Sequence, residues 1–206
     1  MTLRRLILLL GACFTLALAL ALTPALARNV DGIRFDDRAT VAGQELRLNG
    51  AGIRFKAVFK VYAAGLYLTS RCSSLPEVLV VGGARRVRIV LLRDIGSEDF
   101  RQSFLGAIQS NNERSEKTRL ALHLIRLSEQ LSAGADLKSG DVLVADWVPG
   151  IGTTFLRNGQ PFGEPLPDLA FFNAVLRIWL GDKPVDAGLK RLMLGEIPDD
   201  MLEERQ

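Results

Sequence analysis

The spacing of hydrophobic and polar positions changes along the chain, and each change marks a predicted element. Residues 41–69 alternate and are rich in β-branched and aromatic side chains, which predicts two or three strands. The segment NGAG at residues 49–52 is expected to break this run. Two more strands are predicted at residues 77–81 and 85–94, joined by a hairpin turn at the glycine pair 82–83.

Helical spacing follows these strands. Ser97 and the two acids after it are typical of a helix start, because a small polar residue and negative charges favour the positive end of the helix dipole. A second helix is predicted from Ser115 to a stop at Gly134. Its leucines recur at spacings of four, three and four residues, which places them on one narrow stripe: Leu120, Leu124, Leu127 and Leu131.

The second half repeats the order of strands and then helices. Strands are predicted at residues 140–150 and 151–160, with a tight turn at Asn158 and Gly159. Two helices follow, ending at Gly181 and Gly195. Strands grouped apart from helices predict an α+β fold, in which an antiparallel β-sheet is covered on one side by helices.

The first 27 residues have the layout of a secretory signal peptide. Two arginines precede an apolar run at residues 6–22, and Ala25-Leu26-Ala27 forms a small-residue cleavage site. An uncleaved anchor is the alternative. Cleavage predicts a periplasmic protein without stable membrane insertion, with one domain at residues 28–195 and a loose acidic tail at residues 196–206.

Charge and motif content exclude several classes of function. The formal net charge is +3, from 26 basic and 23 acidic side chains, and loss of Arg4 and Arg5 leaves 24 against 23. Such a balance does not predict nucleic-acid binding, which needs a clustered basic surface. The chain has one histidine, His123, and no nucleotide-binding glycine loop, paired Cys-x-x-Cys or Gly-x-Ser-x-Gly motif, so no metal site and no cofactor is predicted.

Both tyrosines of the chain lie in the stretch FKVYAAGLYLTS, and Tyr62 follows Arg54 by eight residues. An even spacing places both side chains on one face of an unbroken strand, while Tyr67 lies on the other face, in the core. Beyond Tyr62 that face turns apolar, at Ala64, Leu66 and Leu68. A pocket for an anionic head group with an apolar tail would have this composition. A solvated sheet face would have it too.

Four segments together resemble the exported bacterial branch of the chalcone isomerase-like family. They are LNGAGIR, FKVYAAGLYL, WVPGIGTTFLRNGQPF and FFNAVLRIWLGDKPVDAGLKRLMLG, which follow one another between residues 47 and 195. The resemblance implies one of two activities. Enzymes of the family close a chalcone into a flavanone, holding the phenolate with an arginine and stabilising an enolate with a threonine and a tyrosine. Non-catalytic members bind fatty acids, with an arginine and a tyrosine on the carboxylate.

The resemblance favours the second activity at the individual positions. The family arginine corresponds to Arg54, and the catalytic threonine to Tyr62. The enzymes' tyrosine falls near Phe100, and their asparagine near Gly106 or Ala107. Arg54 and Tyr62 are therefore the predicted ligand-binding residues, and no catalytic residue is predicted.

Three functions follow as hypotheses. The first is an exported protein that binds a small apolar carboxylic acid, such as a fatty acid, without catalysis. The second is an intramolecular lyase or isomerase acting on a chalcone-like, flavonoid-like ligand with a conjugated carbonyl group. The third is a periplasmic module that binds a partner protein through its sheet face.

Overall fold

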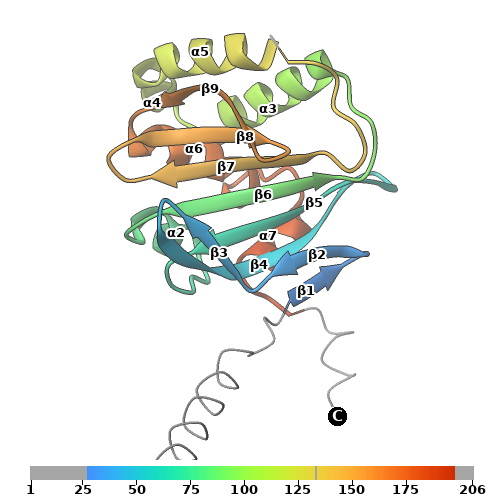
Figure 1. Cartoon of the computed structure of the whole chain (residues 1–206). Helices are drawn as coiled ribbons and strands as arrows, with labels where there is room; N and C mark the ends of the chain where they lie inside the picture. The colour runs from blue at the N-terminus through green and yellow to red at the C-terminus, as the bar shows by residue number, and fades with distance from the viewer. Residues whose placement is uncertain (1–26, 133, 198–206) are drawn as a thin grey trace, which may run out of the picture.

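The structure is a computed structural model that describes residues 27–132 and 134–197, and the predicted signal peptide and most of the acidic tail lie outside these residues. A single antiparallel sheet organises the molecule, with seven strands in the order β3-β4-β5-β6-β7-β8-β9 (Figure 1). Its strands are β3 (Arg38–Val41), β4 (Gln44–Lys56), β5 (Phe59–Leu68), β6 (Arg85–Leu91), β7 (Val142–Val148), β8 (Gly152–Arg157) and β9 (Gln160–Leu166).

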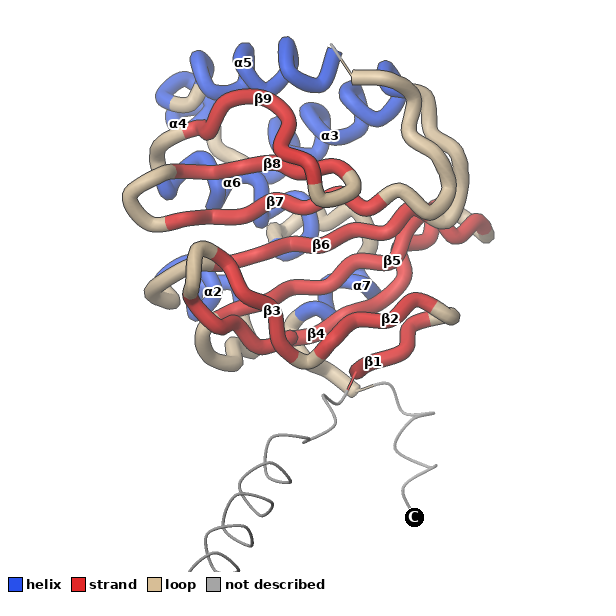
Figure 2. The backbone as a smooth tube through the Cα atoms, in the orientation of Figure 1, coloured by secondary structure: helices blue, strands red, loops and turns tan. Residues whose placement is uncertain are grey.

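Helices cover one face of this sheet, as the sequence predicts (Figure 2). They are α2 (Leu75–Val80), α3 (Ser97–Asn111), α4 (Arg114–Arg119), α5 (Ala121–Ser132), α6 (Leu169–Leu180) and α7 (Ala187–Met193). Helix α6 is the most buried, because it lies between the sheet and α3 and is apolar on nearly all sides. The core on this helix face includes Trp179, Phe171, Leu66 and Leu127.

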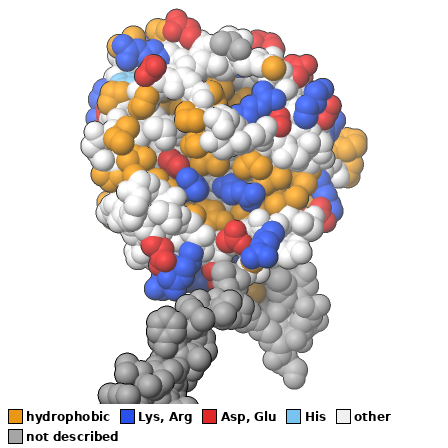
Figure 3. Space-filling view, in the orientation of Figure 1, with side chains coloured by type: hydrophobic (Ala, Val, Ile, Leu, Met, Phe, Trp, Pro, Cys, Tyr) orange, Lys and Arg blue, Asp and Glu red, His pale blue; other side chains and the backbone are white. Residues whose placement is uncertain are grey.

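The opposite face, called the front face below, carries a separate hairpin made of β1 (Ala27–Val30) and β2 (Ile33–Asp36). Neither these strands nor β3 was predicted from the sequence. Phe35 points from β2 into a second, smaller core with Leu46, Leu48 and Tyr67, and it has no exposed surface. Tyr67 is 2% exposed, so the expected core position is confirmed. Figure 3 shows basic side chains among hydrophobic ones over the middle of this face.

The predicted strand at residues 77–81 is wrong, because the segment forms helix α2. Ser74 stands at its N-cap position and a proline, Pro76, lies in the first turn, where its fixed φ angle suits a helix. Glu77 accepts hydrogen bonds from the backbone N–H and the hydroxyl of Ser73. The glycine pair at 82–83 is therefore not a hairpin turn but the connection from α2 to β6.

The predicted break at residues 49–52 is also wrong, because β4 runs through it with only a bulge between Leu48 and Gly50. The glycines serve helix packing instead. A β-carbon at Gly50 would lie 2.0 Å from the carbonyl oxygen of Leu192, and one at Gly52 would lie 2.4 Å from the Leu192 side chain. The chain instead reverses at Ala57 and Val58, where Ala57 has a φ of 53°.

The remaining elements follow the sequence prediction closely, except that β9 was not predicted as a strand. The helix expected from Ser115 begins at Arg114 but is divided at Leu120 into α4 and α5. The turn at Asn158 and Gly159 joins β8 to β9, and both residues have positive φ. Among the described residues no helix combines the length and the apolar character that crossing a bilayer would require.

Candidate ligand-binding site

Arg54 and Tyr62 lie opposite each other on the helix face of the sheet. They are cross-strand partners near the end of the β4–β5 hairpin, which brings together residues separated by a turn. The Arg54 guanidinium carbon lies 5.3 Å from the centre of the Tyr62 ring, within reach of a cation–π interaction. The shared face predicted from the even spacing is thus observed, although a hairpin rather than one unbroken strand produces it.

Tyr62 is 5% exposed, and its phenol oxygen accepts a hydrogen bond of 2.8 Å from the indole Nε1 of Trp179 in α6. Burial raises the pKa of Tyr62, while the positive charge of Arg54 and the Trp179 hydrogen bond act in the opposite direction. The phenol therefore stays neutral at physiological pH. Since an indole nitrogen is only a donor, the phenol's own proton remains available to an acceptor other than Trp179.

Arg54 is half-buried, and no carboxylate of the described residues forms an ion pair with it. Its Nε is buried and has no hydrogen-bond partner within that part of the chain. Asp186, the acid at the start of α7, is instead occupied by the backbone N–H groups of Phe55 and Leu189, each at 2.8–2.9 Å. A buried donor without an acceptor is costly, so Arg54 retains a hydrogen-bonding capacity that the described residues leave unused.

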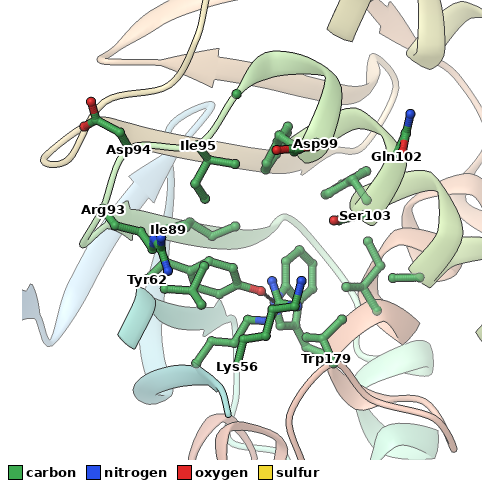
Figure 4. Close-up of a pocket in the computed structure, with 18 residues that line it drawn as sticks. Lys56, Tyr62, Ile89, Arg93, Asp94, Ile95, Asp99, Gln102, Ser103 and Trp179 are labelled. Carbon is green, nitrogen blue, oxygen red and sulfur yellow. Dashed lines mark hydrogen bonds between the residues drawn. The ribbon is translucent and has the colours of Figure 1, made fainter. Parts of the chain in front are cut away.

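A cavity of about 390 Å³ opens beside this pair (Figure 4). Its walls come from β4, β5, β6, the loop after β6, α3 and α6. In Figure 4, Asp99, Gln102 and Ser103 lie on the helix above the cavity, and Tyr62 and Trp179 lie below it. The cavity has the size typical of small-molecule sites.

A small apolar space of about 30 Å³, called the passage below, adjoins the cavity and shares four lining residues with it. Ile89, Phe100, Phe104 and Trp179 line both spaces. A further cavity of about 360 Å³ adjoins the passage, and Phe100 lines all three. In that rear cavity Arg157 is already paired with Asp141 at 2.7 Å. Cationic groups that form no ion pair within the described residues thus line the cavity beside Arg54, whereas the passage is apolar.

Helix α3 forms the wall of the cavity at which the resemblance places two residues of the enzymes' site. Phe100 and Ala107, where the resemblance places a tyrosine and an asparagine of the enzymes, do line the cavity and contribute apolar side chains to that wall. Gly106 does not line it. Ser103 and Arg93 also line the cavity and were not predicted. No sequence motif marks Ser103 as a site residue. Arg93 lies in the loop that follows strand β6, where no periodic pattern predicts its direction.

Groups for a metal are not gathered here. No cluster of three or more histidine, cysteine or acidic residues is present in residues 27–132 and 134–197. His123 stacks on Phe171 with ring centres 5.5 Å apart, which is a packing role on α5. Cys72 is buried as a free thiol, and burial raises its pKa, so it is not activated as a nucleophile.

Comparison with known proteins places the chain in a family. The sequence profile of the chalcone isomerase-like family matches residues 27–195. The protein belongs to the chalcone isomerase-like family. The solved structures that match include a fatty-acid binding protein of Arabidopsis thaliana, with a TM-score of 0.64 and 14% sequence identity. The match covers 79% of this chain and 92% of the plant chain. No curated protein sequence matches.

Proposed function

We propose that this chalcone isomerase-like protein binds a fatty acid or a similar apolar carboxylic acid without converting it. Arg54 holds the carboxylate, and Tyr62 donates a hydrogen bond to one of its oxygens. The observation that carries the proposal is the pair of unused donors in one place. Arg54 has no carboxylate partner among the described residues, and Trp179 orients the Tyr62 phenol while leaving its proton free. A planar guanidinium matches the geometry of a carboxylate.

The acyl tail is proposed to run from Tyr62 along Ile89 toward the passage that Phe100 and Phe104 line. These walls are apolar, so each methylene group that enters them gains about 0.8 kcal/mol, or roughly fourfold in affinity. The plant protein of the same fold is described as a fatty-acid binding protein, which supports this choice of ligand class.

Calorimetric titration with decanoate and with decanol tests the head-group assignment, because the two ligands share a tail and differ in charge. Decanoate should bind at least tenfold more tightly. Equal affinities would contradict a carboxylate site at Arg54. A series of longer acids then tests the tail path: affinity should rise by about fourfold per methylene and level off at the passage, and Phe104→Ala should move that limit to longer acids.

Absence of chemistry is part of the proposal. The apolar side chains Phe100 and Ala107 supply no hydrogen bond to a developing enolate, and each such lost contact commonly costs about 10²–10³-fold in rate. A 2′-hydroxychalcone followed by absorbance should show no enzymatic cyclisation. Rapid turnover that disappears in Arg54→Ala would instead favour the lyase hypothesis.

Export to the periplasm is also proposed, from the predicted signal peptide at residues 1–27. This segment apart from Ala27 lies outside the described residues. N-terminal sequencing of the protein recovered from the periplasm should find Arg28 as the first residue. A chain that begins at Met1 in the membrane fraction would support the uncleaved anchor.

A further inference from the structure

The tip of the β4–β5 hairpin exposes three large apolar side chains close together. Val58 is 82% exposed, Phe59 60% and Phe55 44%. In Figure 1 this hairpin projects from the right edge of the molecule, and Figure 3 shows hydrophobic side chains gathered at that edge. Isolated apolar residues on a surface are ordinary, but three within five positions at a projecting turn are not explained by the core.

Positive charge surrounds this tip. Lys56 and Arg93 are exposed and have no ion-pair partner among residues 27–132 and 134–197, and Arg93 lies over the Phe59 ring at 5.5 Å. Lys60 is paired with Asp31 at 2.7 Å. Of the other nearby acids, Asp94 binds Lys138 and Asp186 accepts from the Phe55 backbone N–H, while Asp99, which lines the same cavity, forms no ion pair within the described residues. The tip therefore combines exposed apolar side chains with two cations, Lys56 and Arg93, that form no ion pair within that part of the chain.

The same residues border the candidate binding site. Lys56 and Arg93 line the mouth of the cavity that contains Arg54, and Phe55 follows Arg54 directly in the chain. A surface bound at the tip would thus face the entrance of the cavity.

We propose that the hairpin tip, Phe55 to Phe59 with Arg93, docks the protein on an anionic phospholipid surface. Apolar side chains flanked by lysine and arginine are the composition that partitions into the boundary between head groups and acyl chains. A second protein is a poorer fit, because a stable interface usually buries about 800 Å² on each partner and this tip is a narrow convex turn. The proposal extends the proposed function by giving the fatty acid a source next to the cavity.

Vesicle flotation of the purified protein tests this docking. Vesicles of equal parts phosphatidylcholine and phosphatidylglycerol should bind the protein, and pure phosphatidylcholine should bind it much less. Val58→Asp should reduce binding to the anionic vesicles by about tenfold or more, because it places a charge where an apolar side chain enters the lipid. Lys56→Glu should weaken binding less, and added salt should weaken binding of the unaltered protein.

Val80→Asp is the matched control, since Val80 is 81% exposed on α2 and lines none of the three cavities. Equal losses in Val58→Asp and Val80→Asp, binding to both vesicle types alike, or binding to neither would overturn the proposal. So would a dimer that Val58→Asp dissolves in sedimentation experiments, because the tip would then be a contact between two copies. Decanoate titration in solution separates the two proposals: Val58→Asp should keep full decanoate affinity, and failure of fatty-acid binding alone would leave vesicle binding intact.

Discussion

Strand β5 carries one tyrosine to each face of the sheet, and both faces place arginines beside aromatic rings. On the helix face, Arg54 lies over Tyr62 and borders a cavity. On the front face, Tyr67 packs with Phe35, and the Arg88 guanidinium lies over the Phe35 ring at 5.0 Å. The two arrangements are alike in residue type, but only the first leaves hydrogen-bonding groups without partners next to an open space.

On the front face, both Arg86 and Arg88 have hydrogen-bond partners within the described residues. Arg86 holds Asp146 through two hydrogen bonds of 2.7 Å each, and Asp146 is 4% exposed. Arg88 also donates to the backbone carbonyl of Arg34. An arginine next to a tyrosine therefore does not by itself indicate a site. Donors that lack an acceptor, beside a cavity, are the feature that distinguishes the helix face.

The largest effect is expected from breaking the closed pair on the front face. Asp146→Ala leaves the Arg86 guanidinium partly buried without a counter-charge, which should lower the free energy of unfolding by about 3–5 kcal/mol. Urea unfolding measures this loss. Asp94→Ala is the control, because its pair with Lys138 is about 62–63% exposed on both sides and should cost no more than about 1 kcal/mol. Similar losses in both variants would show that the front face is not held by this pair.

The same test on the helix face should give the opposite result. Arg54→Ala should weaken decanoate binding by about 10- to 150-fold, since a hydrogen bond to a charged group is worth about 1.5–3 kcal/mol. The free energy of unfolding should change by no more than about 1 kcal/mol, because no carboxylate of the described residues loses its partner. Arg88→Ala on the front face and Arg71→Ala on the surface should both retain full affinity. Binding that falls equally in all three would point to overall charge and against a head-group site.

Tyr67 gives the core of the front face a pH dependence in alkaline solution. Burial raises the pKa of Tyr67 to about 12, above its ordinary value of about 10. Between about pH 10 and about pH 12 the folded protein keeps the Tyr67 proton, whereas the unfolded chain has lost it. The contribution of the neutral phenol to the free energy of unfolding is therefore complete below about pH 10 and is lost as the pH rises through about 12. Tyr67→Phe should therefore lessen the fall in unfolding free energy between about pH 9 and about pH 11 by about 1.4 kcal/mol. Identical pH profiles would show that Tyr67 ionises as easily in the fold as in the unfolded chain.

Elements that carry their own sequence periodicity were predictable, and elements that depend on contacts with distant parts of the chain were not. The alternating run before Thr69 and the leucine stripe after Ser115 carry their own periodicity, so the element types in these segments and the fold class were predicted correctly. Residues 77–81 form only a short apolar run, which periodicity cannot assign, and the proline before it decides for a helix. Strands β1 to β3 have four residues each, too few to show a pattern.

The glycines of β4 misled for a different reason. A glycine in the sequence signals a turn or a close approach, and only the fold shows that α7 lies against Gly50 and Gly52. Only the part of the site that lies on the β4–β5 hairpin was predictable from local spacing. Arg54 and Tyr62 share a strand pair, so local spacing places them together. Phe100, Ser103 and Trp179 reach the cavity from helices distant in the chain, and the hydrogen bond from Trp179 to Tyr62 spans 117 positions.

The smallest expected effect is the most specific to this arrangement. Tyr62→Phe keeps the ring under Arg54 and removes only the hydroxyl, whose proton is proposed to reach the carboxylate. A neutral donor is worth about 0.5–1.5 kcal/mol, so decanoate binding should weaken by about 2- to 12-fold, while decanol affinity changes less. Removing the hydroxyl also leaves the indole N–H of Trp179 without its acceptor, which lowers the free energy of unfolding by a comparable amount. Urea unfolding measures this effect separately from binding. Tyr67→Phe, on the other face of the same strand, is the matched control and should bind decanoate normally. If the two variants bind alike, the Tyr62 hydroxyl serves only to hold α6 on the sheet, and the carboxylate is held by Arg54 without it.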